Sequence, residues 1–334
     1  MTGGHFITGE MMKTIPMGNT DIMITPVGMG VLTIGNTQLN LPLAEGAKIV
    51  RYAYDKGIRL FDTAQFYETY SYIKEAFRDI DMSSNNPDRP VIASKSLVLS
   101  YGEMEDAIQE CLEVLDIETI DIFKLHEVRE DPDFDERAGA WQCLLDYKEK
   151  GIVRAIGVST HNVDVVNRMA DIPDCDIVFP LINYAGLGIR RGPGPGTADE
   201  MAAAIRNCLD NGKTVFGMKA FGGGNLTGSY MKALNYVRDT GVQTMMIGFG
   251  KKSEIDDIVN YAEGKLPEDY QPEVRFKKIR IDQGDCEGCG ACIEKCESRA
   301  IFRNELGLAD VDHDKCLTCG YCAPVCPVRA IIMW

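Results

Sequence analysis

Eight apolar runs of strand length, each followed by an amphipathic helical stretch, constrain the fold of this chain more than any other feature. The strand-like runs lie at residues 27–31, 58–61, 91–94, 120–125, 153–158, 177–180, 214–218 and 244–247. The helical stretches lie at residues 44–56, 70–79, 102–115, 136–150, 163–170, 199–211, 229–238 and 253–262. This alternation predicts a parallel sheet whose strands are joined by helices.

A parallel sheet of this kind is either closed into a barrel or open. Eight strand–helix repeats within about 235 residues fit a closed (β/α)8 TIM barrel by size. The alternative is an open doubly wound sheet, but the dinucleotide fingerprint of such sheets is missing, because Gly28-Met29-Gly30 lacks a correctly placed third glycine. Residues 11–24 alternate around turn signals at 16–19 and predict a hairpin ahead of the first strand. We therefore expect an α/β barrel over residues 1–263.

Length and composition bound the rest of the chain. Its 334 residues leave room for a second, small domain beyond a polar stretch at 264–275, which we interpret as a linker. The net charge of −15 argues against nucleic acid or an anionic membrane as a partner. No apolar run reaches membrane-spanning length, and residues 1–10 carry no secretory pattern, so the expected location is cytoplasmic.

Cysteine is concentrated in residues 276–334, the predicted second domain. Eight of the twelve cysteines lie between Cys286 and Cys326. In a reducing compartment such a group indicates metal ligands before disulfides. The other four are isolated, and we expect them to be small buried hydrophobic side chains: Cys111, Cys143, Cys175 and Cys208.

The eight clustered cysteines form two runs with the same spacing, Cys-x2-Cys-x2-Cys-x3-Cys, and Arg-Ala-Ile follows both. This repeat resembles the bacterial two-cluster ferredoxins over roughly the last 60 residues, which implies a small α+β ferredoxin-like domain with two [4Fe–4S] clusters. In that pattern the fourth cysteine of each run binds the other cluster. The resemblance implies one cluster on Cys286, Cys289, Cys292 and Cys326, and a second on Cys316, Cys319, Cys322 and Cys296.

Zinc is the alternative metal for this segment. Zinc ribbons use two separated Cys-x2-Cys pairs and have no need of a third and fourth cysteine in each run, so iron–sulfur clusters are favoured. Glu297 stands where the resembled proteins have a proline, as Pro327 does in the second run. It is not a ligand, but a carboxylate near a cluster opposes the addition of an electron.

Polar residues stand at the ends of the predicted strands, where a barrel places its activity. Asp62 and Tyr67 lie in Asp-Thr-Ala-x-x-Tyr after the second strand, Lys95 ends the third, and His126 follows the fourth. Together with Gly157-Val158-Ser159 after the fifth strand, these residues resemble the aldo/keto reductase family from about residue 11 to 262. The resemblance implies reduction of a carbonyl or oxidation of an alcohol.

The resemblance also implies a role for each of the four residues. Tyr67 donates the proton to the carbonyl oxygen, and His126 binds that oxygen or shares the proton. A free phenol has a pKa near 10, so we expect the neighbouring cation Lys95 to lower the pKa of Tyr67, with Asp62 keeping Lys95 charged and in place. The purely structural alternatives are that Lys95 and Asp62 form an ion pair that stabilises the fold and that His126 caps a helix.

The residues that would bind NAD(P)H match the family less closely. Ser159 fits the nicotinamide site, whereas Leu181 stands at the expected amide, for which Asn183 is the candidate substitute. Asp256 falls near the place of a phosphate-binding arginine. The remaining candidates follow the seventh and eighth strands: Met218, Lys219, Phe221, Gly222, Lys251 and Ser253. Arg190-Arg191 is either a site for an acidic substrate or a solvated loop pair.

Three functional interpretations stay open. In the first, the chain is an oxidoreductase acting on a small-molecule carbonyl or alcohol, and its clusters pass single electrons to a partner protein. In the second, it is an electron carrier whose barrel is a docking scaffold with little nucleotide binding. In the third, the clusters are purely structural.

Overall fold

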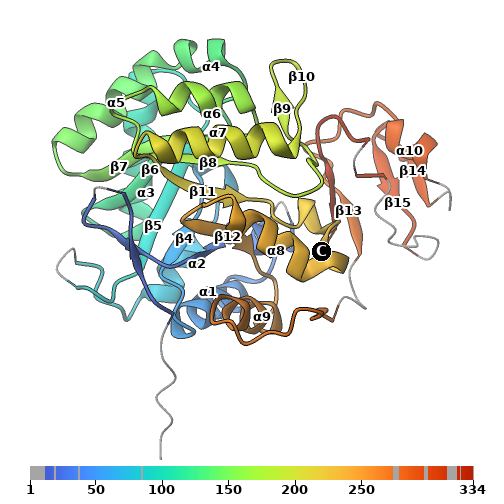
Figure 1. Ribbon diagram of the computed structural model, residues 1–334, viewed down its shortest axis with the longest axis horizontal. Helices are drawn as coiled ribbons and strands as arrows, with labels where there is room; N and C mark the ends of the chain where they lie inside the picture. Colours follow the sequence, from blue (N-terminus) through green and yellow to red (C-terminus); the bar gives the residue numbers. More distant parts are fainter. Residues whose placement is uncertain are drawn as a thin grey trace, which may run out of the picture.

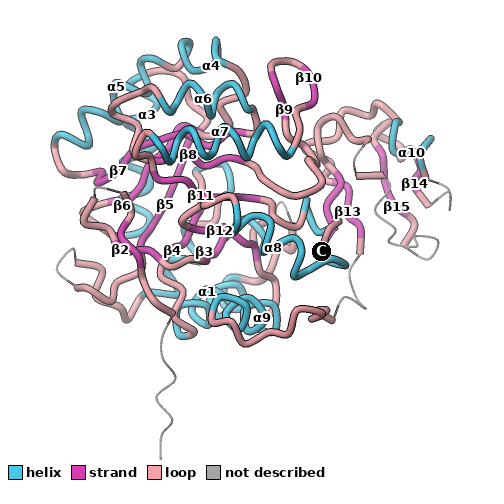
Figure 2. Tube along the Cα trace, in the orientation of Figure 1, coloured by secondary structure: helices cyan, strands magenta, loops and turns pink. Residues whose placement is uncertain are grey.

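The computed structural model describes residues 12–18, 20–36, 38–83, 86–273, 278–296, 300–313, 322–323 and 325–333. Its main body is a closed barrel of eight parallel strands with helices around it (Figures 1 and 2). The barrel strands are β3 (Val27–Gly30), β4 (Leu60–Asp62), β5 (Val91–Ser96), β6 (Ile120–Leu125), β7 (Val153–Thr160), β8 (Ile177–Pro180), β11 (Thr214–Met218) and β12 (Thr244–Gly248).

The principal helices follow these strands in turn. They are α1 (Leu43–Asp55), α2 (Tyr70–Phe77), α3 (Tyr101–Leu115), α4 (Asp131–Glu136), α5 (Ala138–Glu149), α6 (Val163–Ala170), α7 (Ala198–Asp210), α8 (Tyr230–Asp239) and α9 (Lys252–Ala262). Short 3₁₀ turns are η1 (Val31–Ile34), η2 (Gln65–Tyr67), η3 (Gly222–Gly224) and η4 (Thr227–Ser229).

The predicted closed barrel is confirmed, and the open-sheet alternative is wrong. β12 pairs in parallel with β3, Met245 opposite Val27, and β11 pairs with both β8 and β12. Each of the eight predicted strands is present with small shifts at its ends. The predicted hairpin is also present, as β1 (Ile15–Pro16) antiparallel to β2 (Met23–Ile24).

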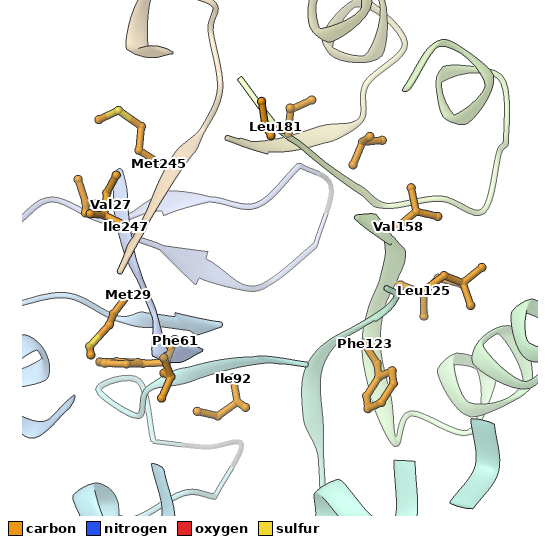
Figure 3. Close-up of a cluster of buried hydrophobic side chains, with 14 of the residues drawn as sticks. Val27, Met29, Phe61, Ile92, Phe123, Leu125, Val158, Leu181, Met245 and Ile247 are labelled. Atoms are coloured by element: carbon orange, nitrogen blue, oxygen red, sulfur yellow. The ribbon is translucent and has the colours of Figure 1, made fainter. Parts of the chain in front are cut away.

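Two apolar layers hold the barrel together because strand side chains alternate between its faces. An inner layer fills the barrel and includes Leu60, Ala93, Ile122 and Phe179, with Met17 of the hairpin region packed against them. An outer layer joins the strands to the helices, and Figure 3 labels several of its members, among them Phe61, Ile92 and Phe123. The hairpin therefore contributes to the barrel's inner core.

Two features of the barrel differ from the sequence prediction. The helix expected at 136–150 is present as α5, but a short helix that was not expected, α4, precedes it. Between the two lies Arg137, whose buried side chain donates 2.7 Å hydrogen bonds to Asp133 and to the His126 carbonyl. Arg190–Arg191 form β9, which pairs with β10 (Gly194–Pro195) in a small exposed hairpin.

All four isolated cysteines are buried, as predicted, and burial raises the pKa of the Cys175 thiol to about 12.

The C-terminal segment forms a small α+β unit beside the barrel (Figure 1). Its elements are β13 (Ile279–Ile281), α10 (Ala291–Lys295), β14 (Ile301–Arg303), β15 (Ala309–Val311) and β16 (Ile331–Met333), with β13 antiparallel to β16 and β14 to β15. β16 packs against η3, and Arg280 hydrogen-bonds the carbonyl of Gln38. This unit therefore lies against loops at the carboxyl ends of the barrel strands. No helix in the described ranges is both long and apolar enough to cross a membrane.

Candidate active site

Strand alternation brings four charged or polar side chains to one end of the barrel interior. Leu60 and Ala93 belong to the inner layer, so Asp62 and Lys95, two residues further along their strands, point the same way. Ile122 likewise places Lys124 and then His126 on the inner face of β6. These side chains meet at the carboxyl ends of the strands, the end at which TIM barrels carry their activity.

Asp62 is shared by two buried lysines. Its Oδ2 accepts a 2.6 Å bond from Lys95 Nζ, and its Oδ1 accepts a 2.8 Å bond from Lys124 Nζ. Burial alone would raise the pKa of Asp62, but Lys124 and Lys95 lower it below its usual value. Burial lowers the pKa of Lys95 to about 8, and the like charge of Lys124 adds to that fall while Asp62 opposes it. The site therefore contains one carboxylate for two ammonium groups.

Lys124 was missed as a site residue, although the sequence carries a signal for it. It is fully buried within the otherwise apolar end of β6, and it stands two residues before His126, on the same face. A lysine on the inner face of a barrel strand needs a buried partner, and Asp62 is that partner.

Tyr67 and His126 lie at the mouth above this ion cluster. The Tyr67 hydroxyl is 3.3 Å from His126 Nε2, and the Lys95 ammonium lies 4.6 Å from the centroid of the Tyr67 ring. Lys95 also donates a 2.8 Å bond to the carbonyl of Thr63. The structure thus brings the four predicted residues together.

The expected fall in the pKa of Tyr67 is wrong in this structure. Desolvation raises the pKa well above 10, and the carboxylates Asp62 and Glu127 raise it further. The Lys95 ammonium does not outweigh these effects, because it is hydrogen-bonded to Asp62 and Thr63 rather than to the Tyr67 hydroxyl. Tyr67 is therefore a neutral phenol at neutral pH.

His126 is also neutral. Burial, followed by the charges of Lys95 and Lys124, holds its pKa well below 6.5. Arg137 fixes its backbone through the His126 carbonyl, whereas Nδ1 of its buried ring meets no hydrogen-bond partner in the described part of the chain. The arrangement can present a neutral imidazole and a phenol to one substrate oxygen.

The candidate nucleotide residues fall into separate places. Ser159 is buried, and its hydroxyl accepts a 2.9 Å bond from the amide of Glu127, the residue after His126. Asn183 is buried with its amide bonded in both directions to the backbone of Leu187, at 2.9 Å each. Met218 ends β11, and Lys219 follows it. Lys251 and Ser253 lie at the start of α9.

A nicotinamide fits this site at one end. The Ser159 hydroxyl still has its own proton to donate, as an amide oxygen requires. The glycine turn η3 beyond β11 has three successive positive φ angles, but β16 packs against that turn and Phe221 stacks on Tyr230 at 5.0 Å. Asp256, where an arginine was expected, forms a 2.6 Å ion pair with Lys56. The nucleotide assignments stay predictions.

The described cysteines of the C-terminal unit suit an iron–sulfur cluster. The amide of Ala309 donates to Cys286 Sγ at 3.4 Å, and that of Ala300 donates to Cys296 Sγ at 3.3 Å, the N–H to sulfur bonds that tune such clusters. Gly288 and Gly290 have φ of 68° and 86°, which keeps the ligand loop compact. Of the other predicted points, Cys316, Cys319 and Glu297 lie outside the described residues.

A (β/α)8 barrel with Asp, Tyr, Lys and His at successive strand ends defines the class of this chain. The family model for the aldo/keto reductase family matches residues 26–241, and the chain belongs to that family. A second model, for a 4Fe-4S dicluster domain, matches residues 279–333. The repeated cysteine runs therefore correspond to an iron–sulfur domain, as the sequence predicted.

Individual relatives are more distant. The 2,5-diketo-D-gluconic acid reductase B of a Corynebacterium species is 33% identical over 150 residues, covering 44% of this chain and 51% of that protein. This chain spans about half the length of the curated relatives it matches. Among solved structures, an aldo-keto reductase of Bacillus halodurans gives a TM-score of 0.59 at 16% identity, covering 77% of this chain and 92% of its own. A Bombyx mori aldo-keto reductase in complex with NADP gives a TM-score of 0.58 at 18% identity, and the match covers 80% of this chain and 91% of that protein.

Proposed function

We propose that this protein is an iron–sulfur oxidoreductase that reduces a small-molecule carbonyl, or oxidises the corresponding alcohol, with Tyr67 as the proton donor. The observation that carries the proposal is the 3.3 Å pair of Tyr67 and His126 above the buried Lys95–Asp62 pair. Neither a capping histidine nor an isolated ion pair needs a phenol at that point.

The side chains divide the work of carbonyl reduction. Hydride brings two electrons to the carbonyl carbon, and negative charge develops on the oxygen. Tyr67, neutral because its pKa is raised, gives its proton to that oxygen while neutral His126 donates a hydrogen bond to it. The surplus positive charge of Lys95 and Lys124 over Asp62 stabilises the Tyr67 phenolate that is left behind.

Two cofactors complete the proposal. A reduced nicotinamide, the hydride donor typical of this family, would be held at Ser159 and would supply the hydride. Two [4Fe–4S] clusters would be held by the eight cysteines assigned above, and they would exchange single electrons with a partner protein. We also propose that residues 264–275 are the linker between the barrel and the iron–sulfur domain.

The test is an anaerobic titration of the whole protein with NADPH and NADH, followed at the nicotinamide and cluster absorption bands together. Nucleotide binding, together with turnover of a carbonyl that Tyr67→Phe abolishes, is the expected result. Turnover that survives in Tyr67→Phe would remove Tyr67 from the chemistry. Bleaching of the clusters by nucleotide would join barrel and clusters in one electron path.

A second candidate is the electron carrier with a barrel that binds little nucleotide. Two observations favour it. β16 packs on the glycine turn η3, a candidate site for the nucleotide, and the side-chain amide of Asn183 is already hydrogen-bonded to the backbone of Leu187 in its own loop. It predicts clusters that dithionite reduces while neither nucleotide binds.

A further inference from the structure

Arg329 reaches from the iron–sulfur segment to the mouth of the barrel. Its guanidinium donates to Nδ1 of His161, which follows β7, at 3.3 Å. It also lies against Gly188, where a side-chain Cβ would overlap the guanidinium. The amide of Arg329 bonds the carbonyl of the proposed cluster ligand Cys326 at 3.3 Å. One residue thus joins the cluster loop to the catalytic end of the barrel.

Lys219 is a second cation at the same place. It keeps solvent-accessible surface, yet desolvation within the mouth and then the charge of Arg329 lower the pKa of Lys219 to about 8. Lys219 is also one of the charges that depress the pKa of His126. The lysine is therefore within electrostatic reach of both Arg329 and the proposed catalytic histidine.

The negative groups facing this pair are the sulfur of Cys326, beside Arg329, and two carboxylates. Glu127 and Asp285 are the nearby carboxylates, and Glu127 is paired with Arg129 at 3.8 Å. Within the described part of the chain, no carboxylate lies within 4.0 Å of Lys219 or Arg329. A chain with a net charge of −15 thus has two cations at its catalytic mouth that form no ion pair with a carboxylate among the described residues.

The backbone at this place is unusual as well. In the described ranges six residues other than glycine have positive φ, and three of them are Glu127 at 53°, Lys219 at 60° and Arg329 at 55°. Left-handed backbone costs free energy in residues with a Cβ and collects at ligand-binding sites. Three such residues come from three distant parts of the chain and converge on one mouth.

We propose that Lys219 and Arg329 form an anion subsite that binds a carboxylate carried by the substrate, so that the substrate class is small oxo acids. The inference rests on the proposed function for its carbonyl, which would lie at Tyr67 and His126. An ammonium and a guanidinium at the same mouth as the reacting oxygen would bind a carboxylate and orient the attached carbonyl for hydride transfer. A nucleotide phosphate shares this anionic chemistry, so the experiment separates the two sources.

The experiment measures binding by anaerobic calorimetry on the whole, cluster-loaded protein, without turnover. The probes are oxamate, an unreactive oxo-acid analogue, and oxamide, its uncharged counterpart. Gly188→Ala displaces the Arg329 guanidinium without a substitution in the cluster segment itself. Lys219→Met removes the second cation. The matched control is Gly186→Ala, which has a positive φ of 66° in the same loop but whose Cβ would meet Ala198 rather than Arg329. Iron content is compared across all variants.

The expected result is oxamate binding that weakens about tenfold or more in Gly188→Ala and in Lys219→Met, but not in Gly186→Ala. Oxamide should bind weakly and equally to all four proteins. Oxamate binding no tighter than oxamide binding, or wild-type affinity in both variants, overturns the proposal. If inorganic phosphate and NADPH lose affinity in these variants while oxamate does not, the cations serve the nucleotide and the substrate assignment is overturned. Failure of the proposed function would instead show as absent turnover with the oxamate result unchanged.

Discussion

Removal of Lys124 should change the protonation of Lys95 in a measurable direction. One carboxylate now serves two ammonium groups, Asp62 to Lys124 at 2.8 Å and to Lys95 at 2.6 Å, and the pKa of Lys95 is about 8. Lys124→Met removes the like charge and leaves Asp62 to Lys95 alone. The pKa of Lys95 should then rise by roughly one to two units, which is about 1.4–2.8 kcal/mol in favour of the ammonium.

The pH dependence of kcat/KM for carbonyl reduction reads this shift. If the Lys95 ammonium is needed to stabilise the Tyr67 phenolate, activity is present below the pKa of Lys95 and is lost above it. The alkaline limb should lie near pH 8 in the wild type and move upward by about one to two units in Lys124→Met. A carbon NMR titration of labelled lysine Cε reads the same pKa without turnover.

Lys213→Met is the matched control for loss of a buried lysine. Lys213 precedes β11 at the opposite end of the barrel and donates to the carbonyls of Ile172 and Pro173. It should leave the alkaline limb where it is. A limb that stays near pH 8 in Lys124→Met, or that moves equally in both variants, would refute the shared-carboxylate reasoning.

Four further substitutions test the ion cluster, the iron site and the barrel. Asp62→Asn leaves two buried lysines without a carboxylate and should lower the free energy of unfolding by about 3–5 kcal/mol in a urea titration. A loss below about 1 kcal/mol would mean that the fold does not depend on this carboxylate to hold the two lysines. Cys326→Ser removes one proposed thiolate ligand and should reduce the iron per chain by about half, whereas unchanged iron would contradict the assignment. Gly157→Ala places a Cβ on the Ile177 carbonyl of the neighbouring strand and should cost about 3 kcal/mol or more. Gly102→Ala in α3, where a Cβ meets open space, should instead stabilise the fold by about 0.5–1 kcal/mol, and equal effects at the two glycines would contradict the packing.

Local periodicity was enough to predict the barrel. Strands such as Ile120–Leu125 and Val153–Thr160 alternate with helices in the sequence itself, so the pattern needs no knowledge of distant contacts. It predicted the helix at 136–150, which is present as α5, but it missed the short α4 before it, because the pattern does not show that Arg137 turns inward at their junction to bond the His126 carbonyl. That bond is a contact between elements, which lies beyond local periodicity.

The candidate site could be predicted only as far as local patterns extend. Asp62, Tyr67, Lys95 and His126 were found because each stands at a strand end in a familiar order. The direction of the Tyr67 pKa was wrong because it depends on burial, which a residue list does not contain. Lys124 was missed because it lies inside an apolar run, and Arg329 because its partners, His161 and Gly188, are more than a hundred positions away in the sequence.

The position of Arg329 also bears on the order in which the molecule is assembled. The ring of strands closes when β12 pairs with β3, so all the residues of the barrel wall have been synthesised by Gly248. Arg329 emerges much later, and its backbone is tied to Cys326, a proposed ligand of iron. A newly made chain can therefore complete its barrel wall before its mouth, and we expect loading of the proposed clusters to be the last step that completes the active site.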